Sequence, residues 1–202
     1  MTTTNFNILF KKVLKESIDE LQLFHGSHAD FDKFDVAYMG SGWGQQNYGY
    51  GFYLAADKQV AQEYARGGII YTVEVPDGKY LYDDKIDRRE ASIIAKKFFN
   101  YFLNSDDDRK EMYSGCEKEF WLYSCKPIED AETGTDIYGV ISNETGDDKE
   151  TSAFLSKLGY TGIILHDDTK YGIMTNYVIF NPDDIKVLNK ERNASTAAEE
   201  IR

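Results

Sequence analysis

The residues with the clearest chemical potential lie in two short stretches of the N-terminal half. His25 ends a short apolar run and stands directly before Gly26 and Ser27. A glycine-rich segment then leads to Tyr53, which lies within a second apolar stretch. Glycine lets the backbone approach a ligand closely, and an aromatic face offers a surface for stacking. Together these features favour a dinucleotide pocket over an ordinary piece of core.

Each of these residues also has an ordinary structural interpretation. A histidine at a strand end is more often a satisfied structural residue, and a tyrosine in an apolar stretch often packs in the core. For His25, the Gly-Ser pair that follows favours the chemical interpretation. For Tyr53, the glycines that precede it favour the same interpretation.

The elements that position these residues follow from the spacing of apolar side chains. Residues 6–21 place apolar side chains on one side of a helix, and a strand at 21–24 follows and ends at His25. Residues 26–50 are polar, aromatic and glycine-rich, which is typical of a functional loop. A short strand is predicted at 52–55.

The next elements are marked by capping and turn residues. Asp57 is placed to cap a helix that runs to about Arg66, where two glycines end it. Strands are predicted at 69–75 and 79–82, joined by a Pro-Asp-Gly turn at 76–78.

Residues 83–150 have a weaker pattern. Asp87 and Glu90 form a potential capping box that opens a helix. The predicted apolar side of this helix comprises Ile93, Ile94, Phe98, Phe99 and Phe102. A second helix is predicted within 109–123, and the acidic segment 126–150 is predicted to be a loop.

The C-terminal part returns to regular elements. A helix is predicted at 151–158, ended by Gly159. The tail from Lys190 is rich in Ala, Glu, Ser and Thr, so we expect it to fray or to form a lone helix. The predicted strands of this part are 160–165, 177–180 and 185–188.

The bulk composition sets limits on size and on partners. A chain of 202 residues fits one domain with a sizeable core. Its formal net charge is −12, and residues 83–150 contain 18 acidic and 10 basic side chains. Such a field repels phosphate backbones and disfavours non-specific nucleic-acid binding, while a nucleic acid held in one local basic groove stays open.

Cysteine usage and hydropathy bear on the compartment. Cys116 and Cys125 are the only cysteines, and their spacing matches no common zinc pattern. A reduced, cytoplasmic compartment is the default for such a chain. The sequence contains neither an export signal nor an apolar run of about 18 residues, so we expect no membrane span.

Ordered motifs in this chain are similar to those of a known family. They are His-Gly-Ser at 25–27, a glycine-rich run over 40–55 that ends in a tyrosine-containing strand, and Asn-Tyr-Val-Ile-Phe at 176–180. The segment 154–163 also looks similar. The set resembles the ADP-ribosyltransferase superfamily, in its diphtheria-toxin and poly(ADP-ribose)-polymerase-like branch. Within that branch it resembles the ADP-ribosyltransferase domains of phage polyvalent proteins.

This resemblance covers roughly residues 21–82 and 151–188. It implies split antiparallel β-sheets flanked by helices, and the irregular mixture of helices and strands also favours the α+β class. We therefore expect a single domain over residues 1–189 with an inserted helical, acidic segment at about 83–150. Residues 190–202 are expected to form a flexible C-terminal tail.

The resemblance also implies a reaction. Enzymes of this superfamily cleave the nicotinamide–ribose bond of NAD, which serves as co-substrate, and no metal is expected. Cleavage develops oxocarbenium character on the ribose, so the enzyme must hold NAD strained and stabilise positive charge. By resemblance, His25 would hydrogen-bond a ribose hydroxyl. The Gly26 backbone would bind the nicotinamide amide with help from Ser27, and Tyr53 would stack on the nicotinamide ring.

Two further residues belong to the implied NAD site. Gly51 lies in the glycine-rich approach to Tyr53. Tyr64 follows Tyr53 at the separation at which two tyrosines of the diphtheria-toxin branch sandwich the nicotinamide. The alternative for Tyr64 is an ordinary aromatic residue of an amphipathic helix.

The third motif position departs from the common pattern of the superfamily. Asn176 stands where many transferases carry Glu, although the phage-associated relatives often show Asn as well. Asparagine can hydrogen-bond the ribose 2′-hydroxyl, but it brings no negative charge, and polymer elongation is not expected. Asp167 and Asp168, predicted to lie in a loop before the strand, could supply that charge. A solvated turn is the favoured interpretation of both.

The resulting hypothesis is mono-ADP-ribosyl transfer from NAD to a macromolecule. A protein acceptor is favoured, with DNA or RNA as the alternative, and residues 83–150 and 30–48 are the candidate acceptor surfaces. We expect a cytoplasmic role in phage–host conflict or as a toxin, with an inhibitor or antitoxin as a candidate partner. The alternatives are an NAD glycohydrolase and a degenerate module that binds NAD or a protein without turnover.

Overall fold

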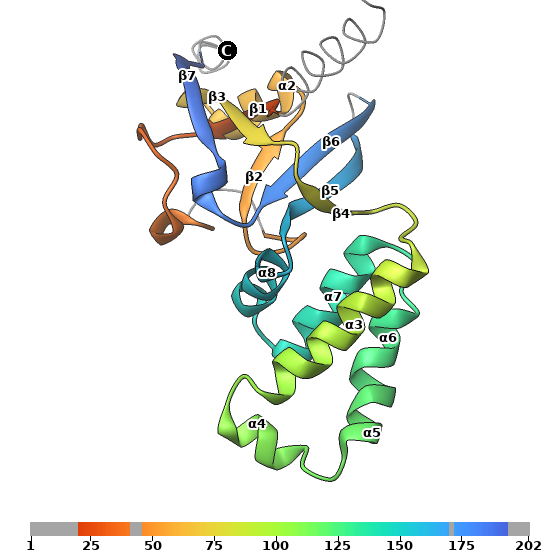
Figure 1. Ribbon diagram of the computed structural model, residues 1–202. Coiled ribbons are helices and arrows are strands. Elements are labelled where there is room, and N and C mark those ends of the chain that lie inside the picture. Colours follow the sequence, from red (N-terminus) through yellow and green to blue (C-terminus); the bar gives the residue numbers. More distant parts are fainter. Residues whose placement is uncertain (1–19, 41–45, 170–171, 194–202) are drawn as a thin grey trace, which may run out of the picture.

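The computed structural model describes residues 20–40, 46–169 and 172–193. Within these residues, seven strands form one sheet in the order β4-β5-β6-β2-β1-β3-β7, with only β4 and β5 parallel (Figure 1). The predicted α+β class is confirmed. The strands are β1 (Glu20–Ser27), β2 (Phe52–Ala55), β3 (Ile69–Pro76), β4 (Lys79–Tyr82), β5 (Tyr160–Thr169), β6 (Gly172–Ile179) and β7 (Lys186–Arg192).

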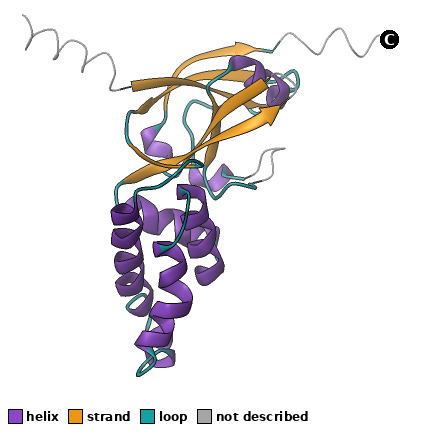
Figure 2. Ribbon diagram, turned by 90° about the vertical axis from the view of Figure 1, so that its right-hand side faces the viewer, coloured by secondary structure: helices purple, strands orange, loops and turns teal. Residues whose placement is uncertain are grey.

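Most helices gather at one end of the sheet, below the strands in the view of Figure 2. They come mainly from the segment between β4 and β5, whereas α2 (Lys58–Ala65) packs on β1 at the other end. The helices of the group are α3 (Arg88–Leu103), α4 (Asp107–Met112), α5 (Glu117–Phe120), the π-helix η2 (Trp121–Cys125), α6 (Lys126–Glu129), α7 (Gly134–Thr145) and α8 (Asp148–Lys157). No helix of the described residues is long and apolar enough to cross a membrane.

The sheet has a weakly paired junction between β1 and β2, called here the narrow junction. β1 pairs with β3 along all of its residues, and β2 pairs with β6 over its whole length. In contrast, β1 and β2 share the single register pair Phe24–Ala55. The expected split between two antiparallel halves is therefore a narrow junction inside one sheet.

The two faces of the sheet bury different cores, because successive strand residues point to opposite faces. α2 adds a small third cluster of Ala61, Ala65 and Ile70. One face packs Leu23, Leu54, Tyr71, Val73, Tyr177 and Ile179 with Phe34. The other face packs Ile163, Leu165 and Val178 against helical residues that include Phe98, Ile137, Ile141 and Phe154.

The predicted elements around the second motif are confirmed, whereas the strand predicted over 21–24 is longer and runs from Glu20 through His25 to Ser27. β2 and β4 have the predicted bounds, and the Asp57 carboxylate caps α2 by accepting a hydrogen bond from the amide of Gln59 at 2.7 Å. Arg66 ends the helix in the left-handed conformation, with φ of 41°. β3 and β4 are not neighbours, however, because β4 runs parallel to β5 at the far edge of the sheet.

Two predictions at the ends of the described segments need correction. Most of the predicted helix 6–21 lies outside the described residues, but Glu20 and Leu21 belong to β1, where they pair with Pro76 and Val75. Similarly, Lys190 does not begin a fraying tail, since β7 pairs with β3 as far as Arg192. Residues 194–202 lie outside the described range.

The prediction of a loop over 126–150 is wrong. These residues form α6, α7 and the start of α8. A complete capping box between Thr133 and Asp136 opens α7, and Ile137 and Ile141 are buried at helical spacing. Acidic and small residues lie between these apolar positions, so the helical spacing of the apolar residues was not evident from the sequence.

The first helices after β4 also differ from the prediction. Asp87 caps α3, but the Glu90 side chain contacts Tyr160 and Lys79 and so takes part in the sheet-to-helix packing. Ile93 is 58% exposed, so it does not belong to the buried side. The predicted helix at 109–123 is two helices, because Gly115 interrupts it with φ of 81°.

The C-terminal elements are longer than predicted. α8 begins at Asp148 and ends before Gly159, whose φ is 87°. β5 continues beyond Leu165 to Thr169, and β6 begins at Gly172, because the two strands pair as a hairpin throughout. Backbone pairing satisfies this outer, polar half of the hairpin, although its sequence has few apolar residues.

Candidate active site

The three motif residues lie on three neighbouring strands at the narrow junction of the sheet. His25 is on β1, Tyr53 is on β2 and Asn176 is on β6. Ala55 of β2 pairs both with Phe24 of β1 and with Asn176 of β6. The sheet topology therefore brings residues that are far apart in the sequence onto neighbouring strands. The ring of Tyr53 packs with the helical core, whereas the His25 ring lies with aromatic side chains of the other core.

His25 bridges the junction with its side chain. Its Nδ1 lies 2.9 Å from the carbonyl oxygen of Tyr53. Because a carbonyl only accepts, Nδ1 carries the proton, and Nε2 of the neutral ring is left as an acceptor. Burial lowers the pKa of His25, and the hydrogen bond to Tyr53 opposes this only in part. The imidazole is thus a neutral hydrogen-bond acceptor.

Aromatic side chains surround the His25 ring and fix the segment that follows β1. The ring centroids of Phe34 and Tyr71 lie 5.2 and 6.1 Å from that of His25. The Tyr71 hydroxyl accepts from the Phe31 amide at 2.9 Å and donates to the Ala29 carbonyl at 2.7 Å. This segment is therefore folded back over the imidazole.

Tyr53 is held by the glycine-rich segment that precedes it. Its hydroxyl donates to the Gly49 carbonyl and accepts from the Tyr48 amide, each at 3.0 Å. Burial raises the pKa of Tyr53 to about 12, so the phenol stays neutral at physiological pH. Because the hydroxyl is occupied by the backbone, the ring position is fixed, and the ring faces are what the residue can offer to a ligand.

The small residues of the motifs have packing reasons of their own. A Cβ on Gly26 would lie 1.9 Å from the carbonyl oxygen of Ala61 in α2. A Cβ on Gly51 would lie 2.6 Å from Cγ1 of Val178 in β6. The Ser27 hydroxyl accepts from the Ala29 amide at 3.1 Å. These residues therefore have structural roles at the junction, independent of any contact with a ligand.

Tyr64 lies on α2 and is 52% exposed. The pKa of Tyr48 is raised first by its hydrogen bond to Asp167, then by burial and by the charge of Asp167, and last by the nearby Tyr64 hydroxyl. Tyr64 therefore lies on the same side of the molecule as the glycine-rich segment that holds Tyr53.

Asn176 has a carboxylate partner, which corrects the interpretation of Asp167 as part of a solvated turn. Asp167 lies in β5, and its Oδ2 accepts from Nδ2 of Asn176 at 2.7 Å. Its Oδ1 accepts from the Tyr48 hydroxyl at 2.8 Å. Asp168 also lies in β5, where alternation points it to the opposite face.

The helices between β4 and β5 support the glycine-rich segment directly. The Tyr50 amide donates to the Tyr138 hydroxyl of α7 at 2.9 Å, and Ser152 of α8 donates to the Tyr50 carbonyl at 2.7 Å. Burial raises the pKa of Tyr138 to about 12. The sequence did not single out Tyr48 or Tyr138, because nothing in their local pattern indicates partners on distant elements.

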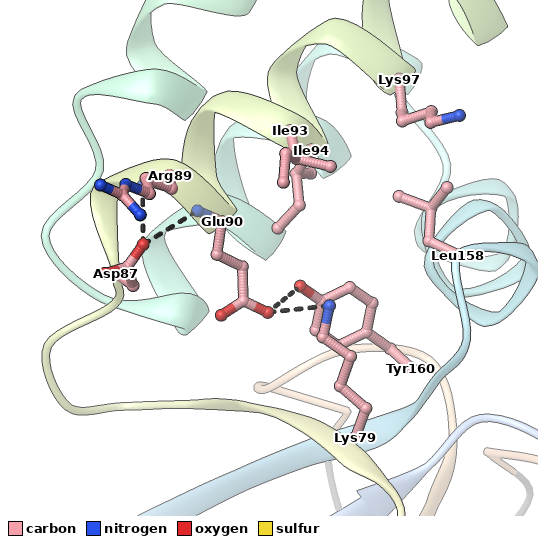
Figure 3. A pocket seen from close by; sticks show the side chains of 9 residues that line it. All are labelled: Lys79, Asp87, Arg89, Glu90, Ile93, Ile94, Lys97, Leu158 and Tyr160. Carbon is pink, nitrogen blue, oxygen red and sulfur yellow. Dashed lines mark hydrogen bonds and ion pairs between the residues drawn. The ribbon is translucent and has the colours of Figure 1, made fainter.

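A surface hollow of about 480 Å³ lies elsewhere, between the start of α3 and the starts of β4 and β5 (Figure 3). Glu90 bonds the Tyr160 hydroxyl at 2.5 Å and the Lys79 amine at 2.9 Å inside it. Tyr160 and Asp167 lie about 23 Å apart along β5, at a rise of about 3.3 Å per residue. This hollow is therefore separate from the motif residues.

In the described part of the chain, no group of three or more His, Cys, Asp or Glu is placed to hold a metal ion.

Comparison with known proteins identifies the family of this arrangement. A family model described as ADP-Ribosyltransferase in polyvalent proteins matches residues 19–195. No curated protein matches the chain. A solved structure titled "Crystal structure of an anti-CRISPR protein" is 14% identical, with 85% of this chain and 97% of that chain covered and a TM-score of 0.35. A likeness at this TM-score carries no argument about fold or function.

Proposed function

The chain belongs to the family of ADP-ribosyltransferases in polyvalent proteins, and from this premise we propose that it is a mono-ADP-ribosyltransferase. It cleaves the nicotinamide–ribose bond of NAD, transfers ADP-ribose to a nucleophile on a macromolecule, and releases nicotinamide and a proton. The observation that carries the proposal is the meeting of His25, Tyr53 and Asn176 on adjacent strands at the junction of the sheet.

The proposed mode of NAD binding follows from the geometry of these groups. Nε2 of His25 accepts a hydrogen bond from a ribose hydroxyl, since Nδ1 is committed to the Tyr53 carbonyl. The fixed ring of Tyr53 stacks on the nicotinamide, with Tyr64 of α2 opposite it. The backbone at Gly26, with Ser27, binds the nicotinamide amide, and Gly51 keeps the approach to Tyr53 close to β6.

The proposed catalysis is electrostatic and positional. The departing nicotinamide leaves as a neutral ring, and positive charge develops on the ribose until the acceptor attacks. A neutral His25 suits this step, because an imidazolium at the same place would repel the developing charge. Asn176 is proposed to hold the ribose 2′-hydroxyl. Because Asn176 stands where many transferases carry Glu, we propose that a single ADP-ribose unit is transferred, without polymer elongation.

The acceptor is proposed to be a protein, because a net charge of −12 disfavours nucleic-acid backbones. Exposed side chains that suit recognition occur in both candidate surfaces. Tyr38 within 30–48 is 71% exposed, and Tyr123 within 83–150 is 72% exposed.

The proposed biological role is in the cytoplasm, either in phage–host conflict or as a toxin that an inhibitor restrains. Growth arrest on expression that Tyr53→Ala relieves is expected, whereas harmless wild-type expression would argue against the toxin role.

Two other functions have to be separated from transfer. An NAD glycohydrolase would use water as acceptor at the same site. A degenerate binding module is motivated by the neutral Asn176, which brings no charge of its own to the ribose. Release of nicotinamide that depends on His25 would exclude the binding module.

The test uses NAD that carries a label on its adenylate half. The wild-type protein and the Tyr53→Ala variant are incubated with labelled NAD and a bacterial lysate, and protein and nucleic acid are then separated. Label in one fraction, absent with the variant, would establish transfer and name the acceptor class. Nicotinamide release without label in either fraction would favour the glycohydrolase, and equal labelling by both proteins would sink the proposal.

A further inference from the structure

We propose that Asp167 is a positioning residue for the third motif position. Its carboxylate fixes the amide of Asn176 so that Oδ1 of Asn176 accepts a hydrogen bond from the 2′-hydroxyl of the nicotinamide ribose. The inference deepens the proposed function and rests on it, because the ribose belongs to NAD bound at that site.

The orientation of the amide follows from the chemistry of its partner. An ionised carboxylate has no proton to donate, so the group that faces it must be a donor. Nδ2 of Asn176 donates to Oδ2 of Asp167 at 2.7 Å. The amide oxygen is then directed away from Asp167. Without the carboxylate, a neutral partner would accept either end of the amide, and Oδ1 would lose its fixed direction.

The register of the β5–β6 hairpin explains why these two side chains meet. Asp167 pairs with Met174, and Asn176 pairs with Leu165. Asp167 and Asn176 are therefore diagonal neighbours on one face, within reach of each other's side chains. Asp168 pairs with Ile173 and points to the other face. Only one of the two adjacent carboxylates can reach Asn176.

Asp167 is itself held, which a positioning role requires. Its second oxygen, Oδ1, accepts from the hydroxyl of Tyr48 at 2.8 Å. The amide of Tyr48 donates to the hydroxyl of Tyr53 at 3.0 Å. One chain of hydrogen bonds thus joins Tyr53, the glycine-rich segment, Asp167 and Asn176, so the stacking residue and the ribose-binding residue are fixed relative to each other.

The same contact accounts for the absence of Glu at the third position. Because Asp167 bonds the amide of Asn176, its negative charge would lie one amide away from a ribose held by Asn176. Donors and charges that are already oriented stabilise a developing charge without further rearrangement. Asn176 contacts the substrate in this arrangement, and Asp167 acts through it.

The test compares Asp167→Asn with Asp168→Asn, which makes the same chemical change one residue along the strand. Binding of NAD, and of an NAD analogue that lacks the 2′-hydroxyl of the nicotinamide ribose, is measured by calorimetry. Wild type and Asp168→Asn are expected to prefer NAD by about fivefold, the size of one net hydrogen bond. Asp167→Asn is expected to bind the two compounds within about twofold of each other, because the amide oxygen is no longer directed at the hydroxyl.

A second variant guards against a folding defect in the first. Tyr48→Phe removes one hydrogen bond to Asp167 and leaves the charge of Asp167 in place. The preference of this variant for NAD over the analogue should therefore lie between those of wild type and Asp167→Asn. Thermal unfolding of each variant is recorded beside binding. A preference that also stays unchanged in Asn176→Ala would overturn the inference, since Asn176 is the group through which Asp167 acts.

The remaining outcomes separate the inference from the proposed function. If Asp167→Asn and Tyr48→Phe discriminate as wild type does, Asp167 does not orient Asn176, and the proposed function still stands. If wild type binds NAD but does not prefer it over the analogue, Asn176 does not contact the 2′-hydroxyl. The inference then fails together with the proposed role of Asn176, while NAD binding at the site still stands. If wild type binds neither compound, the proposed function and the inference fail together.

Discussion

At the scale of single residues, the surroundings of His25 determine its protonation and its free acceptor. The protonated Nδ1 of His25 donates a hydrogen bond to the Tyr53 carbonyl, and burial lowers the pKa of the ring below its ordinary value of 6.5. A histidine at a strand end can be purely structural, but here its contact with β2 is what bridges the narrow junction. The residue therefore couples stability to pH at the proposed NAD site.

The stability of the protein should fall as the pH drops below about 6.5, in part because of His25. In that range the unfolded chain binds the proton while the folded chain, with its lowered pKa, does not. At pH values well above 6.5 the residue is neutral in both states and contributes no pH dependence. Each pKa unit of lowering corresponds to about 1.4 kcal/mol.

Urea unfolding from pH 8 to pH 5 measures this effect, with His25→Gln as the reference. The difference in free energy of unfolding between wild type and His25→Gln should be constant above pH 6.5 and shift against wild type below it. A difference that does not change with pH would show that His25 titrates alike in the folded and unfolded states. His28 and His166 are present in both proteins, so the comparison isolates the effect of His25.

At the scale of elements, the contact of α2 with β1 depends on the missing side chain of Gly26. The Cβ position of Gly26 is filled by the backbone of Ala61, which cannot give way as a flexible side chain can. Phe24 packs on the same small cluster of Ala61, Ala65 and Ile70. The glycine of the His-Gly-Ser motif thus seats the helix that carries Tyr64.

Gly26→Ala should lower the free energy of unfolding by about 1–3 kcal/mol or more, because α2 must move away from β1. Gly139→Ala is the matched control. Gly139 lies within α7, where a Cβ would meet nothing within 4 Å. Its replacement should raise the free energy of unfolding by about 0.5–1 kcal/mol, since alanine favours the helix. Equal effects at the two sites in thermal or urea unfolding would contradict the packing role of Gly26.

At the scale of the whole molecule, the helices between β4 and β5 contact the glycine-rich segment of the sheet region directly. Tyr138 of α7 and Ser152 of α8 hold both backbone polar groups of Tyr50. Tyr50 lies between Tyr48, which bonds Asp167, and Tyr53. These helices therefore support the proposed NAD site, and we expect their removal to abolish NAD binding.

Tyr138→Phe should weaken NAD binding and lower the free energy of unfolding by about 1–3 kcal/mol, because the Tyr50 amide loses its partner in a part-buried place. Tyr123→Phe makes the same change at a side chain that is 72% exposed on the same group of helices. That variant should match wild type in calorimetric NAD binding and in stability. NAD binding by Tyr138→Phe at the wild-type level would show that the helices do not support the loop.

Local chemistry in the sequence was enough to predict several features of this protein. The Asp57 cap, the strand at 52–55 and the helix that ends at Arg66 depend on neighbours in the chain, and the structure confirms them. The motif residues His25, Tyr53 and Asn176 were likewise recognisable as an ordered set. Their proposed roles come from the resemblance, and the geometry of the junction supports them.

Tertiary structure alone decided which residues surround that set. Asp167 looked like part of a turn because its neighbours are polar, yet strand pairing satisfies their backbone and directs the carboxylate to Asn176. Tyr138 was hidden in a segment whose helical pattern is diluted by acidic residues. Register and long-range packing are set by the whole fold, and a local pattern does not encode which distant side chains they bring together.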